Sequence, residues 1–127
     1  MTADLVAFLR ARLDEDDRAA RAATPGPWTT RNLGSHDGSS IVADTGKRTR
    51  IGLPVGPVLG AMHGPCGAAD GSHAARHDLA RVLRQTAILR DRVDLWSKML
   101  GSHAPACLRA VAAIWADHPD YREEWTL

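Results

Sequence analysis

Apolar side chains recur every three or four positions in three segments of the chain, which is the period of an α-helix. The first segment, residues 3–23, carries its apolar face on Leu5, Phe8, Leu9 and Leu13. Two prolines, at positions 25 and 27, follow it. Proline lacks a backbone N–H and disfavours helical geometry in the residue before it. The pattern therefore predicts one amphipathic helix over residues 3–23.

The longest helical pattern covers residues 78–100. Asp78 suits the N-cap position, and Gly101 suits the position just after the helix. Between them an apolar stripe repeats at alternating steps of three and four, through Leu79, Val82, Thr86, Leu89, Val93, Trp96 and Leu100. Such a stripe packs against another helix. Because its flanking positions carry no complementary charges, antiparallel packing on the first helix within a monomer is favoured over a coiled-coil dimer.

A third helix is predicted over residues 105–117, where Pro105 suits the first turn. Its apolar face consists of Leu108, Val111, Ile114 and Trp115. His118-Pro119 ends it, and residues 118–127 form a polar and aromatic tail that we expect to fold back.

Shorter segments between the first two helices have the character of strands. The expected strands are residues 28–32, 40–43 and 49–53, joined by turns at Asp37-Gly38 and Thr45-Gly46. Residues 54–72 are rich in Gly, Pro and Ala and are expected to form a long mobile surface loop. The prediction is thus an α+β fold in a single domain over residues 1–127: a three-helix core, a small antiparallel hairpin or meander over residues 28–53, and one long loop.

Composition narrows the classes of partner. The chain has 127 residues, a net charge of +1 and two cysteines, Cys66 and Cys107. So small a net charge does not favour nucleic acid, and one short basic run, residues 47–50, does not make a basic face. No apolar stretch is long enough to span a bilayer, and residues 1–23 lack the pattern of a signal peptide. We expect a cytoplasmic protein with reduced thiols.

Two pairs of residues have the spacing of half-sites for zinc. His63 and Cys66 are three positions apart, and His103 and Cys107 are four apart. Short spacers let two ligands meet one tetrahedral ion, so a zinc site is one hypothesis. The alternative is incidental: glycines flank the first pair, and Cys107 lies on the apolar face of the third helix, where a thiol behaves as a small hydrophobic group.

A second cluster lies at the start of the helix over residues 78–100. Arg76, His77 and Arg81 gather there, where free backbone N–H groups and the helix dipole attract anions. The alternative is a solvated basic patch paired with acidic side chains. His73 and His77 have metal-pair spacing, but the cap at Asp78 places both before the helix, where that spacing need not align them.

Few residues are candidates for a catalytic role. These are His77 and Asp78, with Cys66 as a nucleophile and His63 as its base. Nothing in the sequence supplies the rigid, electropositive environment that an activated thiolate needs.

Four tryptophans dominate the aromatic residues. Trp28 and Trp125, with Tyr121, could pack together and close the N-terminal turn against the tail. The alternative is an aromatic interaction surface or ligand groove built from the same three residues.

Three segments carry a family resemblance. Residues 4–28 end in Ala-Thr-Pro-Gly-Pro-Trp, and residues 107–125 end in Ala-Asp-His-Pro-Asp-Tyr-Arg-Glu-Glu-Trp. With residues 73–84, these blocks resemble an uncharacterised family of small actinobacterial and actinophage proteins, a domain of unknown function. Members typically have Pro where Leu79 stands, and often have additional Cys and His between the last two helices. The resemblance implies no activity.

The sequence therefore favours a non-catalytic accessory or interaction module of actinobacterial or phage origin. Its partner would be another protein or a small anionic ligand, and it could carry a metal or anion site. The alternative is a small enzyme of specialised metabolism with a His/Asp site, including a Cys, in a groove.

Overall fold

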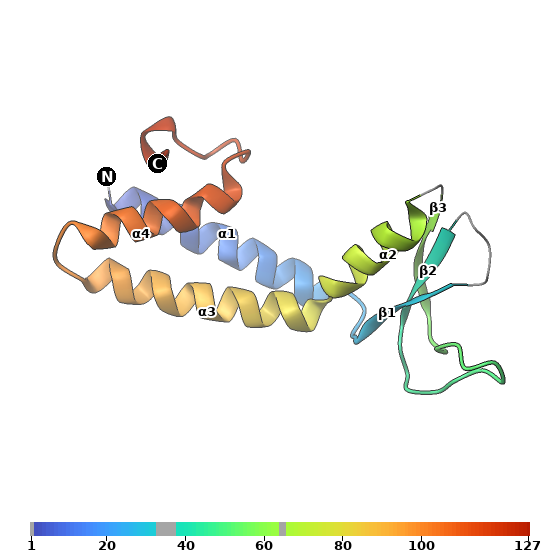
Figure 1. Ribbon diagram of the computed structural model, residues 1–127. Coiled ribbons are helices and arrows are strands. Elements are labelled where there is room, and N and C mark those ends of the chain that lie inside the picture. The colour runs from blue at the N-terminus through green and yellow to red at the C-terminus, as the bar shows by residue number, and fades with distance from the viewer. Residues whose placement is uncertain (1, 33–37, 64–65) are drawn as a thin grey trace. The chain divides into compact units, whose positions relative to one another are not determined.

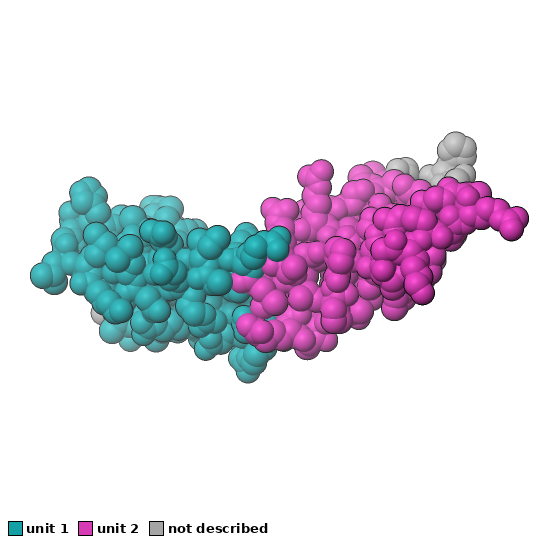
Figure 2. Space-filling view, turned by 90° about the horizontal axis from the view of Figure 1, so that it is seen from below, with its two compact units in different colours: residues 1–18, 84–127 teal, residues 19–83 magenta. Residues whose placement is uncertain are grey.

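The computed structural model describes residues 2–32, 38–63 and 66–127. Four α-helices and a three-stranded antiparallel sheet confirm the α+β class within these residues. The chain forms two compact units, shown in Figure 2: unit 1 comprises residues 1–18 and 84–127, and unit 2 comprises residues 19–83. One domain over residues 1–127 stays a prediction.

Unit 1 is built on two long helices that lie side by side (Figure 1). They are α1, Thr2–Ala22, and α3, Leu79–Lys98. Arg10 donates to Asp94 at 2.8 Å and Arg90 donates to Asp14 at 2.7 Å. Arg10 precedes Asp14 in α1, whereas its partner Asp94 follows Arg90 in α3. The two helices therefore run in opposite directions, which confirms the antiparallel arrangement. The bond from Arg10 lowers the pKa of Asp94.

The third helix of unit 1 is α4, His103–Ala112, continued by a 3₁₀ turn, η1, Ala113–Trp115. The core of the unit contains buried residues from all three helices: Leu5, Val6, Phe8, Leu9, Leu13, Val93, Leu108, Ala112 and Trp125. A three-helix core is therefore confirmed. Leu100 departs from the predicted stripe, since it is 99% exposed. The helix ends at Lys98, so Leu100 falls outside its face. Gly101 lies beyond it at a φ of 121°.

The described helices include none with the length and apolarity to cross a membrane.

The tail folds back onto α1, as expected, and the Phe8 ring is the centre of that contact. The rings of His118, Tyr121 and Trp125 lie 5.9, 6.0 and 5.0 Å from it, centroid to centroid. Trp125 belongs to a second 3₁₀ turn, η2, Glu123–Trp125. Edge-to-face and tilted aromatic pairs contribute beyond their buried area. Phe8 therefore determines where the tail lies.

Arg12, one turn after Phe8, holds the same tail electrostatically. Its side chain is only 8% exposed. The guanidinium contacts both ring nitrogens of His118, donates to Glu15 at 3.0 Å and lies 3.5 Å from Asp120. A buried charge is tolerated only when it is paired and hydrogen-bonded. The tail supplies that pairing, so the motif beginning at Asp117 has a structural role.

Unit 2 contains the antiparallel sheet, in the order β1-β2-β3. The strands are β1, Trp28–Arg31, β2, Gly38–Ala43, and β3, Val58–His63. The central strand β2 supplies the buried apolar residues Ile41, Val42 and Ala43. The predicted strands at 28–32 and 40–43 are thus confirmed to within two residues. The predicted turn at Asp37 lies outside the described residues.

The prediction of a loop over residues 54–72 is wrong. This segment contains β3 and the first part of α2, Gly67–Arg76, which packs against the three strands (Figure 1). Glycine was the misleading signal. Gly67 and Gly71 are buried one turn apart, and a Cβ on Gly71 would overlap the hydroxyl of buried Ser39. Ser39 donates to the Gly67 carbonyl at 3.2 Å. The glycines give α2 a smooth face that can approach the sheet closely.

The predicted third strand at 49–53 is also wrong, because those residues form a turn. The Gly52 N–H donates to the Thr49 carbonyl at 2.9 Å, and Gly52 has a φ of 82°. Residues 44–57 extend the β2–β3 hairpin instead. Arg48 donates to both carboxylate oxygens of Asp44, at 2.8 and 3.0 Å. These bonds, with the Gly46 N–H, lower the pKa of Asp44.

Replacing Phe8 by Ala removes the ring that the tail packs on. We expect Phe8→Ala to lower the free energy of unfolding by about 3–5 kcal/mol, measured by urea denaturation. Leu100→Ala, at an exposed position in the same unit, is the control and should change it by less than about 0.5 kcal/mol. Equal effects of the two substitutions would contradict the central role of Phe8.

Two glycines in unit 2 form a matched pair for testing the hairpin. A Cβ on Gly56 would overlap the carbonyl oxygen of Ala43, whereas one on Gly60 would meet nothing within 4 Å. Gly56→Ala should cost about 1–3 kcal/mol, because the backbone must shift. Gly60→Ala should be neutral or slightly stabilising. Hydrogen exchange of the Ala43 and Thr45 amides, which bond across the hairpin, measures both effects. Faster exchange in both variants alike would count against a close approach at Gly56.

Candidate functional site

The four predicted zinc ligands are divided between the two compact units. His63 and Cys66 belong to unit 2, and His103 and Cys107 belong to α4 in unit 1. Cys66 is exposed and Cys107 is half-buried, and both are free thiols. Among the residues that the structure describes, no three His, Cys, Asp or Glu side chains lie close enough together to hold a metal ion. The side chain of His63 lies outside that description. Zinc stays a hypothesis from the sequence.

The two histidines before α3 are arranged differently from the prediction. His73 belongs to α2, and His77 is the C-cap of that helix, its N–H donating to the Ala74 carbonyl. Their rings lie 4.7 Å apart, centroid to centroid. Both histidines precede α3, as expected, but His73 lies on a helix of its own, because the end of the segment taken for a loop forms α2. The observed contact is between the two rings.

The start of α3 already holds a carboxylate of its own. Asp78 accepts a hydrogen bond from the Arg81 N–H at 3.0 Å, which confirms it as the N-cap. Arg81 in turn lies 3.5 Å from the Arg76 carbonyl. An added anion would compete with Asp78 for the positive end of the helix. The anion site at Arg76, His77 and Arg81 therefore stays a prediction.

The segment Ala-Thr-Pro-Gly-Pro-Trp lies against this cap. A Cβ on Gly26 would lie 3.2 Å from the Asp78 carboxylate and 3.1 Å from the Trp28 backbone nitrogen. The Trp28 indole donates to the Thr24 carbonyl at 2.8 Å. Two of the blocks that carry the family resemblance thus meet within unit 2. Of the catalytic candidates, Asp78 has a structural role here.

The three residues of the predicted aromatic surface are divided between the two units. Trp28 belongs to unit 2, and Tyr121 and Trp125 belong to unit 1. Trp125 is 2% exposed, so its ring is part of the core and not of a surface. Tyr121 is half-buried, with its ring 5.8 Å from that of Trp125. Each tryptophan is thus held within its own unit.

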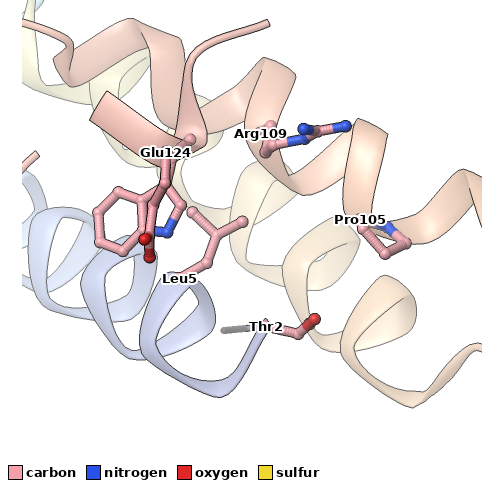
Figure 3. A pocket seen from close by; sticks show the side chains of 6 residues that line it. Thr2, Leu5, Pro105, Arg109 and Glu124 are labelled. Atoms are coloured by element: carbon pink, nitrogen blue, oxygen red, sulfur yellow. The ribbon is translucent and has the colours of Figure 1, made fainter. Parts of the chain in front are cut away.

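The structure shows a pocket in unit 1 that the sequence did not predict. It has a volume of about 150 Å³. Three segments far apart in the sequence line it, namely α1, α4 and η2, through Thr2, Leu5, Pro105, Arg109, Glu124 and Trp125. Figure 3 shows Pro105 and Arg109 on one helix, Thr2 and Leu5 on another, and Glu124 on the tail. The spacing of four residues places Pro105 and Arg109 on the same face of α4.

Two of the residues that line this pocket have buried polar atoms without a partner. The indole Nε1 of Trp125 and the Nε of Arg109 are inaccessible to solvent and bond to nothing in the described structure. Arg109 is half-buried and makes no ion pair with any described residue. A buried donor without an acceptor costs about 1–3 kcal/mol. Both orphaned atoms are donors, and both belong to residues that line the pocket.

The other charges around the pocket are paired. Arg122 lies 3.0 Å from Asp4 and 3.6 Å from Glu124. Its guanidinium also stacks over the Trp125 ring, 5.3 Å from the centroid. The negative charge of Glu124 is therefore partly balanced by Arg122. Arg109 keeps a positive charge in the wall without a counter-ion from the described chain.

Comparison with known proteins gives a family. Residues 2–127 match the family described as a family of unknown function (DUF6221). The chain belongs to DUF6221. No curated protein and no solved structure matches it.

In this DUF6221 chain the pocket residues escaped sequence reasoning for a physical reason. Arg109 and Glu124 resemble ordinary solvated charges, and Thr2 and Pro105 resemble helix starts. Trp125 was singled out from its place in a family motif, either as packing with Trp28 or as part of an aromatic surface, and not as part of a pocket with α4. No spacing rule shows that the turn containing it is buried against α1.

Removing the carboxylate of Asp78 tests whether it serves as a cap. Asp78→Ala should lower the free energy of unfolding by about 1 kcal/mol, and Asp78→Ser should restore most of it, because serine caps equally well. Urea denaturation and hydrogen exchange of the Arg81 amide measure the effect. An alanine variant as stable as the parent, with its Arg81 amide still protected, would show that the cap contributes nothing.

Proposed function

We propose that this DUF6221 chain is a non-catalytic binding module that acts through the pocket of unit 1. The observation that carries the proposal is the coincidence of two orphaned donors, Trp125 Nε1 and Arg109 Nε, in the wall of one pocket. Buried polar groups in folded proteins are almost always satisfied. A ligand that accepts hydrogen bonds would satisfy both.

The chemistry elsewhere supports binding more than catalysis. The carboxylate of Asp78 is engaged as a helix cap, and Cys66 is an exposed thiol at the start of α2. In the alternative, a small enzyme would use His77 and Asp78. Such an enzyme would have to break the cap to free its carboxylate.

The setting of the module is part of the same proposal. Its partner is another protein or a small anionic ligand, and nucleic acid is disfavoured by a net charge of +1. A monomer is favoured because Val93 and Trp96 of the α3 stripe pack into the core of unit 1. The free thiols support a cytoplasmic location. The resemblance to small actinobacterial and phage proteins supports an actinobacterial or phage origin. The motifs that end at Trp28 and at Trp125 are then features of the family.

Indole N–H signals in ¹⁵N–¹H spectra test the proposal directly. The chain has four tryptophans, and Trp125→Phe identifies the signal of Trp125 by its loss. The probes, each added at millimolar concentration, are benzoate, benzamide, phenol and acetate. We expect at least one to shift the Trp125 signal in a saturable way and to leave that of Trp28, in the other unit, unchanged. If none of the four shifts it, the pocket is not a ligand site.

A further inference from the structure

We infer that the ligand of the unit 1 pocket is a carboxylate that carries an apolar group about the size of a phenyl ring. The inference rests on the proposed function and adds the chemical class of the ligand. Four properties of the pocket lead to it: the kind of orphaned atom, the charge, the volume and the lining.

The orphaned atoms require an acceptor. An indole N–H is only a donor, and a guanidinium has five N–H donors and no acceptor. Trp125 and Arg109 therefore exclude a ligand whose polar end only donates, such as an ammonium group. The fork of an arginine matches the two oxygens of a carboxylate, and such charge-assisted bonds are about twice as strong as neutral ones.

The charge separates a carboxylate from a neutral carbonyl. Arg109 lacks a counter-ion among the described residues, while Asp4 and Glu124 are both within ion-pair distance of Arg122. An anion bound at Arg109 would neutralise the charge that the fold leaves unbalanced.

The lining and the volume define the rest of the ligand. Leu5, Pro105 and the Trp125 ring give the pocket an apolar wall. A dry cavity of about 150 Å³ is known to hold benzene. The pocket, at about 150 Å³, therefore accommodates one ring or one branched side chain beside the carboxylate.

Isosteric probes test the inference on the full chain. Benzoate and benzamide have nearly the same shape, but only benzoate carries a charge. Titration of the Trp125 indole signal should show benzoate binding at least about tenfold more tightly than benzamide. Arg109→Gln should weaken benzoate binding by about tenfold or more and leave benzamide binding nearly unchanged, since a hydrogen bond between charged groups is stronger than one to a neutral group. Arg92→Gln, at an exposed position on α3, is the matched control and should change neither.

The outcomes separate this inference from the function it rests on. If benzamide binds as tightly as benzoate, the carboxylate class is wrong and the binding module stands. If no probe binds, both fail. If Arg109→Gln leaves benzoate binding intact, the role assigned to Arg109 is wrong. The variants' unchanged amide spectra away from the pocket check that they fold.

A carboxylate can come from a free small acid or from the C-terminus of a peptide. The tripeptide Gly-Gly-Phe and its C-terminal amide distinguish the two sources. Tighter binding of the tripeptide acid than of benzoate, lost in the amide, supports the class and identifies a peptide terminus. If benzoate binds and the tripeptide acid does not, the carboxylate class is supported and the ligand is a free small acid. Equal binding of the tripeptide acid and its amide would contradict the inference.

Discussion

The packing of the C-terminal tail on one face of α1 is the contact on which the helical unit depends. Phe8 supplies the apolar part, with three rings of the tail around it. Arg12, one turn along, supplies a guanidinium that is 8% exposed and that pairs with His118 and Glu15. Without the tail, this guanidinium would lose most of its partners in a partly apolar setting, which costs more than the pair contributes when intact. The motif from His118 to Trp125 is therefore explained by folding before any function is assigned to it.

The same contact creates the pocket. Because Phe8 holds Trp125 in the core, the indole N–H is removed from water, and the neighbouring segments offer it no acceptor. Arg109, on α4, lines the same pocket, and Arg122 keeps Glu124 partly neutralised. The stability of the tail and the capacity to bind a ligand are thus linked: the interactions that bury the tryptophan also leave its donor unsatisfied. That link is the physical basis for the proposed binding module.

Unit 2 shows a different constraint, which is the close approach of a helix to a sheet. Gly67 and Gly71 leave α2 with a smooth face, and Ser39 on the central strand bonds directly to the helix backbone. The helix then ends at His77 and the next begins after Asp78, whose carboxylate caps it. His77 and Asp78, the catalytic candidates from the sequence, therefore lie at the junction between α2 and α3, where their observed contacts are structural.

Much of this protein follows from local pattern alone. Three amphipathic helices, the cap at Asp78, the strands around Trp28 and Ile41, and the α+β class were all predicted, since periodicity and capping act within one or two turns. Tertiary structure decided what depends on distant partners. The glycine-rich residues 54–72 form β3 and the first part of α2, because the glycine face of that helix packs closely against the sheet. The pocket joins residues from both ends of the chain to α4, and Trp125 packs against Phe8, more than a hundred positions earlier, in the core. No local rule carries such information, because burial belongs to the assembled core.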